Sequence, residues 1–144
     1  MLRLTALSLA AAGALAFAAP SFAASASDWS KSADKICDRA NAALDKIAQP
    51  KSTPELIAAS ERFLEVGKQQ AADLAKLKRP PADAAAIGKV VGIYEQQAGL
   101  VNGLLAALRK NDQKAVKTLV ARGDALEVTA AKIVKGLGAA KCAR

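Results

Sequence analysis

The sequence predicts an all-α protein, in which four helices form an antiparallel up-down-up-down bundle and a disulfide tethers the C-terminal tail. Apolar residues recur at alternating spacings of three and four, which is the period of an amphipathic helix. Prolines, glycines and an Asn-Asp pair divide the chain into four such stretches, joined by connections of a few residues. Aromatic residues make up only 3% of the chain, while alanine and leucine abound, and this composition favours helix over strand.

The first predicted helix covers residues 28–48 and ends before Pro50, because proline cannot continue a helix. Cys37 flanks the apolar stripe of this helix, which is expected to face a neighbouring helix. The stripe consists of Trp29, Ala33, Ile36, Ala40, Leu44 and Ile47.

The second predicted helix covers residues 54–78 and is stopped by the Arg-Pro-Pro sequence at 79–81. Thr53 is suited to cap its N-terminus, Pro54 suits its first turn, and Glu55 suits the positive end of the helix dipole. Its stripe consists of Leu56, Ser60, Phe63, Gly67, Ala71 and Leu74.

The third predicted helix covers residues 84–110, with Asp83 as a candidate N-cap. Four glycines share a side of this helix away from its main apolar face: Gly88, Gly92, Gly99 and Gly103. They indicate either a close contact with a second copy or merely a smooth surface, and we favour the second interpretation because glycine rows prove little without a partner. The apolar face consists of Ile87, Val90, Tyr94, Gln97, Val101, Leu104, Leu105 and Leu108.

The fourth predicted helix covers residues 113–135, with Asp112 as its N-cap. Gly136 and Gly138 are expected to break it at the C-terminal end. Its stripe consists of Val116, Leu119, Gly123, Leu126, Ala130, Ile133 and Leu137.

The first 23 residues have the three-part pattern of a secretory signal peptide. A basic start at Arg3 precedes an apolar run from Leu4 to Ala19, and Ser21-Phe22-Ala23 offers a cleavage site. A cut after Ala26 is the alternative, and an uncleaved anchor is disfavoured because a membrane span needs roughly 20 apolar residues. We therefore expect an exported protein of the periplasm, cell envelope or extracellular space, with residues 24–144 as one helical domain that is not integral to the membrane.

The only two cysteines, Cys37 and Cys142, are expected to form an intramolecular disulfide in an oxidising compartment. A straight fourth helix running to Cys142 would carry it too far from Cys37, because disulfide Cα atoms lie within about 7 Å. If the helix stops near Lys135, a gap of roughly 17 Å remains, which residues 136–142 can span. The glycines at 136 and 138 are expected to let the chain reverse there.

The composition argues against an enzyme or a cofactor-binding protein. The chain has no histidine, and its only methionine is Met1. The commonest general base and the usual ligands of zinc and haem are therefore missing. No phosphate-binding glycine loop or nucleophile elbow occurs, and no pair of carboxylates lies on an apolar stripe. We expect no catalytic residues, no metal site and no cofactor.

One polar position interrupts the apolar face of the third helix. Gln97 lies there one turn from Tyr94, at about the depth of Ser60 on the second helix. These three residues are a candidate polar pocket in the bundle core. The simpler interpretation is a buried amide that fixes helix register through hydrogen bonds, and we favour it because buried polar groups usually satisfy each other.

Positive charge is concentrated at the C-terminal end. The whole chain has a net charge of +8, and residues 109–144 hold nine basic and three acidic side chains. Lys114 and Lys132 share an azimuth on the fourth helix, as do Lys117 and Lys135, because each pair is separated by five whole turns. This basic stripe is either an ordinary solvated face or a docking surface for an anionic envelope component. Nucleic acid fits poorly, since no aromatic residues are interleaved for stacking.

The chain resembles a group of small, uncharacterised secreted helical proteins of GC-rich bacteria. The resemblance rests on Ile36-Cys37 followed by Asn41 and Leu44, on the Leu77 to Pro80-Pro81 break, and on the ending from Gly136 to Ala143. It implies a bundle with a cysteine near each end and no particular activity. The expected function is non-enzymatic binding or structural support, with docking through the basic stripe or carriage of an apolar small molecule as alternatives.

Overall fold

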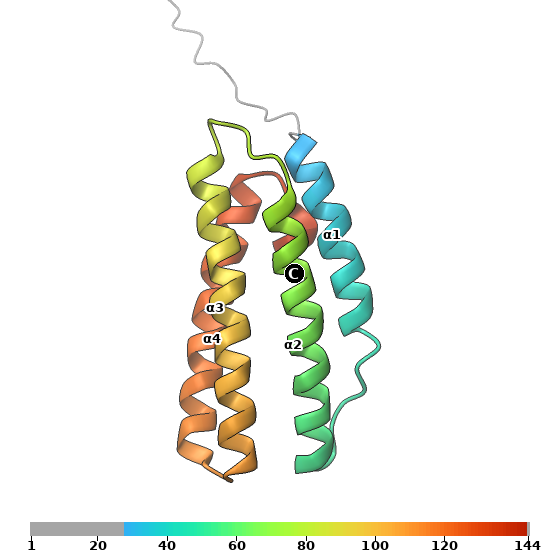
Figure 1. Ribbon diagram of the computed structural model, residues 1–144, viewed down its shortest axis with the longest axis vertical. Helices are drawn as coiled ribbons and strands as arrows, with labels where there is room; N and C mark the ends of the chain where they lie inside the picture. The colour runs from blue at the N-terminus through green and yellow to red at the C-terminus, as the bar shows by residue number, and fades with distance from the viewer. Residues whose placement is uncertain (1–27, 144) are drawn as a thin grey trace, which may run out of the picture.

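The computed structural model describes residues 28–143, and within them it contains helices and no strand. The helices are α1 (Asp28–Leu44), α2 (Thr53–Lys76), α3 (Ala84–Arg109) and α4 (Gln113–Gly136), followed by the short 3₁₀ helix η1 (Ala140–Ala143). Along the bundle, α1 runs downward, α2 back up, α3 down and α4 up again (Figure 1). The all-α class and the disulfide-tethered tail are confirmed. The predicted signal peptide, residues 1–23, lies outside the described residues.

The helix ends follow from local hydrogen bonding, with two departures from prediction. The N-cap of α2 is Ser52 rather than Thr53, because the Ser52 hydroxyl accepts the Glu55 N–H at 3.4 Å. Asp112 caps α4 as predicted, accepting the Ala115 N–H at 2.9 Å. Asp83 holds the N-cap position of α3 but makes no capping bond. Its backbone is already helical (φ −107°, ψ −1°), whereas a capping side chain needs the extended conformation.

Neighbouring helices in the sequence pack against each other, and the C-terminal tail completes the bundle. Within the described residues, α1 packs on α2, α2 on α3 and α3 on α4, whereas α1 and α4 make no direct backbone approach. The small helix η1 instead lies against both α1 and α4. The tail therefore closes the fourth side of the bundle.

The reversal after α4 is a Schellman motif. Gly138 has a positive φ of 78°, and the Ala139 and Gly138 N–H groups donate to the carbonyls of Val134 and Lys135. Ala139 and Val134 are both fully buried, which supplies the apolar contact of this motif. The chain then turns back along α1 and joins Cys142 to Cys37, with their Cα atoms 5.1 Å apart. The predicted helix stop and chain reversal are thus confirmed.

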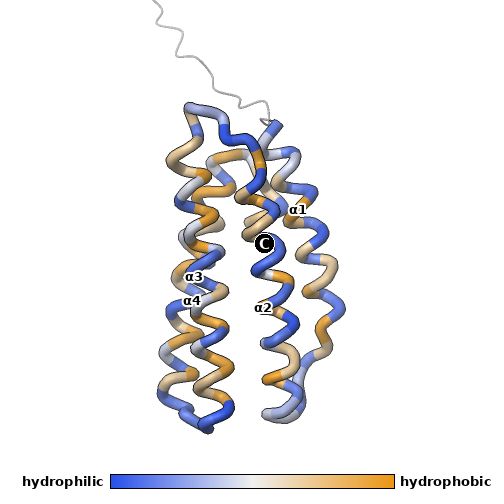
Figure 2. Tube along the Cα trace, viewed as in Figure 1, coloured by the Kyte–Doolittle hydropathy of each residue, from blue (hydrophilic) through white to orange (hydrophobic). Residues whose placement is uncertain are grey.

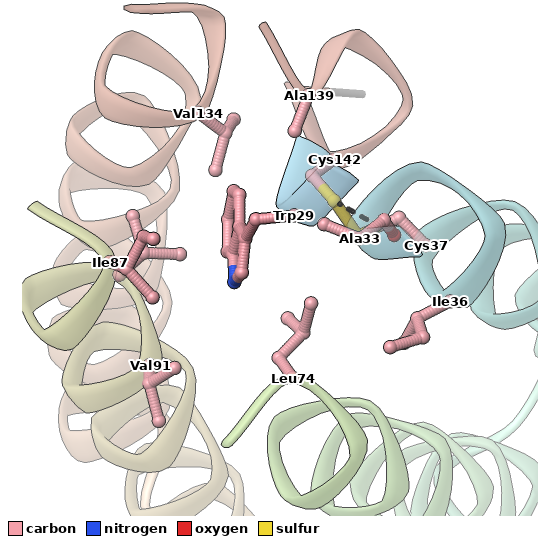
Figure 3. Close-up of a cluster of buried hydrophobic side chains, with 11 residues drawn as sticks. Trp29, Ala33, Ile36, Cys37, Leu74, Ile87, Val91, Val134, Ala139 and Cys142 are labelled. Carbon is pink, nitrogen blue, oxygen red and sulfur yellow. Dashed lines mark hydrogen bonds between the residues drawn. A yellow bond between two sulfur atoms is a disulfide. The ribbon is translucent and has the colours of Figure 1, made fainter. Parts of the chain in front are cut away.

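The main core lies in the upper half of the molecule, around Trp29. The indole is 3% exposed and lies in the middle of the cluster, with Val134 of α4 and Ile87 of α3 on one side and Leu74 of α2 below (Figure 3). Because the backbone of α1 does not approach α3 or α4, this long side chain links the first helix to the opposite half of the bundle.

The lower half is less well covered because α1 is short. The helix ends at Leu44 instead of Ala48, well above the lower ends of the other helices (Figure 1). Apolar positions nevertheless continue along α2, α3 and α4 below that level (Figure 2). Leu56 and Phe63, predicted to belong to a buried stripe, are 36% and 46% exposed. The stripe predicted on α2 is therefore only partly buried, at Ser60, Ala71 and Leu74, because α1 stops above the lower end of α2.

Candidate functional site

A partly enclosed cavity of about 160 Å³ lies where the upper core gives way to the open lower half. Side chains from all four helices line it, and Cys142 of η1 forms part of its wall. Its apolar lining includes Leu44, Phe63, Leu64 and Val101, and its polar lining consists of Asn41, Gln70, Tyr94, Gln97 and Glu127. The cavity is thus mainly apolar with a few polar groups, which is the usual character of a small-molecule site.

Two of the polar side chains bind the backbone of the tail, and a third contacts the disulfide. The Tyr94 hydroxyl donates to the Cys142 carbonyl at 3.2 Å. Asn41 donates from Nδ2 to the Lys141 carbonyl at 3.0 Å, and Gln70 donates from Nε2 to the Cys37 sulfur at 3.2 Å. The tail end of the cavity is therefore a structured polar wall built around the disulfide.

Two of the lining side chains stay unengaged. Within residues 28–143, Gln97 and Glu127 make no hydrogen bond or ion pair with another side chain or with the backbone of another element. Gln97 is half-buried on α3, and Glu127 is exposed on α4. Both side chains can therefore accept a hydrogen bond from a bound molecule.

The pKa of Tyr94 reflects the burial and the charge of its surroundings in the cavity. Burial, with a smaller contribution from the negative charge of Glu127, raises the pKa of Tyr94 to about 12. Both effects disfavour the phenolate, because one removes water and the other adds a like charge. Tyr94 is therefore a neutral hydrogen-bond donor near pH 7.

An open hollow adjoins this cavity toward the lower end of the molecule. Its volume is about 190 Å³, and it shares Phe63, Gln97, Val101 and Glu127 with the cavity. The remaining walls are mostly apolar, with Asp124 as a second carboxylate: Leu100, Leu104, Leu119, Val120, Gly123 and Asp124. The cavity and the hollow thus form one continuous groove, left uncovered because α1 stops at Leu44.

The structure brings together two of the three residues predicted to form a polar pocket. Tyr94 and Gln97 line the same cavity. Ser60 is 8% exposed, so it is buried, but it does not line that cavity. Gln97 lies 13 residues from the start of α3 at Ala84, whereas Ser60 lies 16 residues from the end of α2 at Lys76. Ser60 is therefore roughly 4.5 Å deeper than Gln97, and the wall of α2 at the level of Gln97 comes from Phe63, Leu64 and Gly67.

Sequence analysis missed three polar residues of the site: Asn41, Gln70 and Glu127. Each lies three or four residues from members of a predicted stripe, as Glu127 follows Gly123 and precedes Ala130. Such positions are at the edge of a helix face. The spacing indicates that these residues lie at the edge of an apolar helix face. It does not indicate whether a cavity lies next to that face.

The predicted basic stripe is exposed on α4. Lys114, Lys117, Lys132 and Lys135 are all exposed. The ion pairs of the described residues involve other groups, namely Arg39–Asp73, Lys76–Asp73, Arg109–Glu61 and Lys141–Asp38. Val128, 56% exposed, is also on this helix. The four ammonium groups are therefore available to an outside partner.

No group of three potential metal ligands occurs among residues 28–143. In the same part of the chain, no helix is both long enough and apolar enough to cross a membrane. Comparison with known proteins finds no matching family model, no matching curated protein and no matching solved structure.

Proposed function

We propose that this chain is an exported, non-enzymatic binding protein that holds a small apolar molecule between its helices. The observation that carries the proposal is the partly enclosed cavity of about 160 Å³, with neutral Tyr94 and unengaged Gln97 in an otherwise largely apolar wall. A cavity of about 150 Å³ in another protein accommodates benzene. The expected ligand therefore has an apolar body of about one ring or a short branched chain.

Binding fits the chemistry of the cavity better than catalysis does. General acid–base catalysis works best with a group whose pKa lies near the working pH. Tyr94 titrates at about 12, far above neutral pH. The other polar lining groups are amides and one carboxylate on the exposed side of α4, so they offer orientation and hydrogen bonding.

Export is supported by the disulfide and by the N-terminal sequence. Cys37 and Cys142 are bonded in the structure, and such bonds persist mainly in oxidising compartments. The signal-peptide pattern of residues 1–23 points the same way. The periplasm, the cell envelope and the extracellular space are the compartments that fit.

Gly67 allows a direct test, because it lines the cavity and a Cβ added there would meet nothing within 4 Å. Gly67→Leu should fill the cavity without a clash. The matched control is Gly99→Leu, since Gly99 is exposed on α3, is not part of the lining and also has space for a Cβ. Titration with 2-phenylethanol, followed by amide NMR shifts, measures binding by each protein.

We expect shifts in the wild type and in Gly99→Leu, centred on the cavity residues, and none in Gly67→Leu. Melting temperatures of both variants establish that they remain folded. The proposal fails if the wild type shows no shifts at the cavity with any small apolar probe, or if folded Gly67→Leu binds as well as the wild type.

A second candidate function is docking to an anionic envelope surface through the basic stripe. It is favoured by one observation: four exposed lysines on α4 lack ion-pair partners among the described residues. Lys114 and Lys132 lie on the side of α4 away from Glu127, whereas Lys117 and Lys135 lie nearer to the cavity.

A further inference from the structure

We propose that the molecule bound in the cavity is an apolar cation, an amine whose ammonium group lies against Glu127. This inference rests on the proposed binding function and specifies the chemical class of its ligand. It follows from three observations: the sign of the charges along the groove, the unused hydrogen-bond acceptors where the cavity meets the hollow, and the shape of the cavity.

The charges that line the groove are all negative. Among the lining residues of the cavity and the adjoining hollow, Glu127 and Asp124 carry charge, and neither lysine nor arginine is present. The chain as a whole has a net charge of +8. A negatively charged groove on a positively charged protein is a local feature, opposite in sign to the background, and it complements a cation.

Among the described residues, the lysines of α4 make no ion pair with the acidic side chains of the groove. Glu127 follows Lys114 by 13 positions, which puts it roughly 140° away around the helix at 100° per residue. Lys132 shares the azimuth of Lys114, whereas Lys117 and Lys135 lie roughly 80° from Glu127 by the same count. Lys114 and Lys132 thus lie on a different face of α4, and the Glu127 carboxylate makes no ion pair with any of the four lysines within the described chain.

Glu127 lies at the junction of the two spaces, since it lines both the cavity and the hollow. Gln97 lines both as well and offers a carbonyl oxygen. An ammonium group at this junction can donate to the carboxylate and to the amide carbonyl, while its apolar body occupies the cavity beside Leu64 and Val101. The influence of Glu127 on Tyr94 indicates that its charge is felt inside the cavity.

The same geometry disfavours the other classes of ligand. A carboxylate or phosphate would meet the Glu127 charge with no cation in the wall to offset it, and like charges repel more strongly away from bulk water. A neutral alcohol can use Gln97 and Tyr94 but gains nothing from the carboxylate charge. The order of affinity should therefore be cation, then neutral molecule, then anion.

Three probes of nearly equal shape test this order: 2-phenylethylamine, 2-phenylethanol and phenylacetate, each titrated calorimetrically at neutral pH and low salt. We expect the amine to bind about tenfold more tightly than the alcohol, which corresponds to about 1.4 kcal/mol, and phenylacetate to bind most weakly. Glu127→Gln should remove the preference for the amine, measured as the ratio of the amine affinity to the alcohol affinity in the same protein.

Glu95→Gln is the matched control, because Glu95 is exposed on α3 outside the groove lining and its loss changes the net charge equally. It should keep the tenfold preference. Equal binding of amine and alcohol by the wild type, or a preference that persists in Glu127→Gln, would overturn the inference while leaving the proposed binding function intact. If none of the three probes binds, both proposals are overturned.

Discussion

The hydroxyl of Tyr94 on α3 donates a hydrogen bond to the carbonyl of Cys142, 3.2 Å away and 48 positions later in the chain. The same residue, Cys142, is bonded through sulfur to Cys37 on α1. A single residue of the tail thus ties two helices whose backbones do not approach each other. Because Cys142 also lines the cavity, the tether that stabilises the fold is part of the candidate site.

Breaking the disulfide should therefore affect both stability and binding. The bond spans 105 positions, and the chain-entropy model gives about 4–5 kcal/mol for a loop of that size. We expect the double variant Cys37→Ser, Cys142→Ser to lose stability of this order in urea unfolding and to bind 2-phenylethanol weakly, since η1 is released. Non-reducing peptide mapping of the wild type should find one Cys37–Cys142 link within a monomer. Free thiols or an intermolecular bond would contradict the structure.

Tyr94 should titrate with a pKa of about 12, well above its ordinary value of about 10. It is the only tyrosine of the chain, so ultraviolet absorbance of the phenolate reports on it alone. Glu127→Gln should lower this pKa, whereas Glu95→Gln should not. The folded state retains the proton more tightly than the unfolded state, so this contribution to stability is complete below about pH 10 and is lost as the pH rises toward 12. A pKa near 10 would mean that the ring is hydrated.

Local signals in the sequence were sufficient for most of the fold. The Asp112 cap is a short-range feature, as is the glycine at 138, and both act as their residue types predict. The disulfide and the reversal could be predicted because Cys37 and Cys142 have only each other as partners. These features depend on neighbouring residues or on counting along the chain, and hence they can be derived without a structure.

The end of α1 could not be derived in this way. Ile47 continues the apolar spacing, yet the helix stops at Leu44 and Ile47 lies in the turn that follows. Trp29 fixes the level of α1 by packing among Leu74, Ile87 and Val134 near the upper ends of the other helices (Figure 3). The connection from 45 to 52 must then descend to the start of α2. Register between helices decides this, and the hydrophobic period carries no information about it.

The candidate site could be predicted from the sequence only in part, for the same reason. Tyr94 and Gln97 stood out because they interrupt an apolar face, and they do line the cavity. Glu127 gave no such signal, since a carboxylate at the edge of a stripe is ordinary on a solvated helix. The cavity exists because α1 is short and the tail folds back, and both features depend on tertiary packing.

Trp29 should be the most sensitive position of the upper core. Trp29→Ala removes a side chain that is 3% exposed, and losses of about 3–5 kcal/mol are typical of such truncations. Trp29→Phe should cost clearly less, because the indole Nε1 is buried without a hydrogen-bond partner among the described residues and its removal relieves an unsatisfied donor. Urea unfolding followed by circular dichroism compares the two. Equal losses would show that the Nε1 group is hydrated or paired in solution.

If the basic stripe on α4 is a docking surface, its four lysines should contribute to binding of anionic membranes. A lysine near an anionic membrane contributes about 1 kcal/mol at low salt, so replacing Lys114, Lys117, Lys132 and Lys135 with glutamine should weaken binding to anionic lipid vesicles by roughly a thousandfold. The effect should shrink as salt shortens the Debye length, about 10 Å at 0.1 M. Melting temperature should hardly change, because the four side chains are exposed and make no ion pair within residues 28–143.

The matched control replaces four exposed lysines on the other helices and connections, Lys46, Lys68, Lys78 and Lys89, and so removes the same net charge. If docking depends on the stripe, this control should retain most of the vesicle affinity, because its charges are spread around the molecule instead of aligned on one helix. Equal weakening by both sets would show that only the overall charge matters. A wild type that does not sediment with anionic vesicles at low salt would leave the stripe as a solvated face.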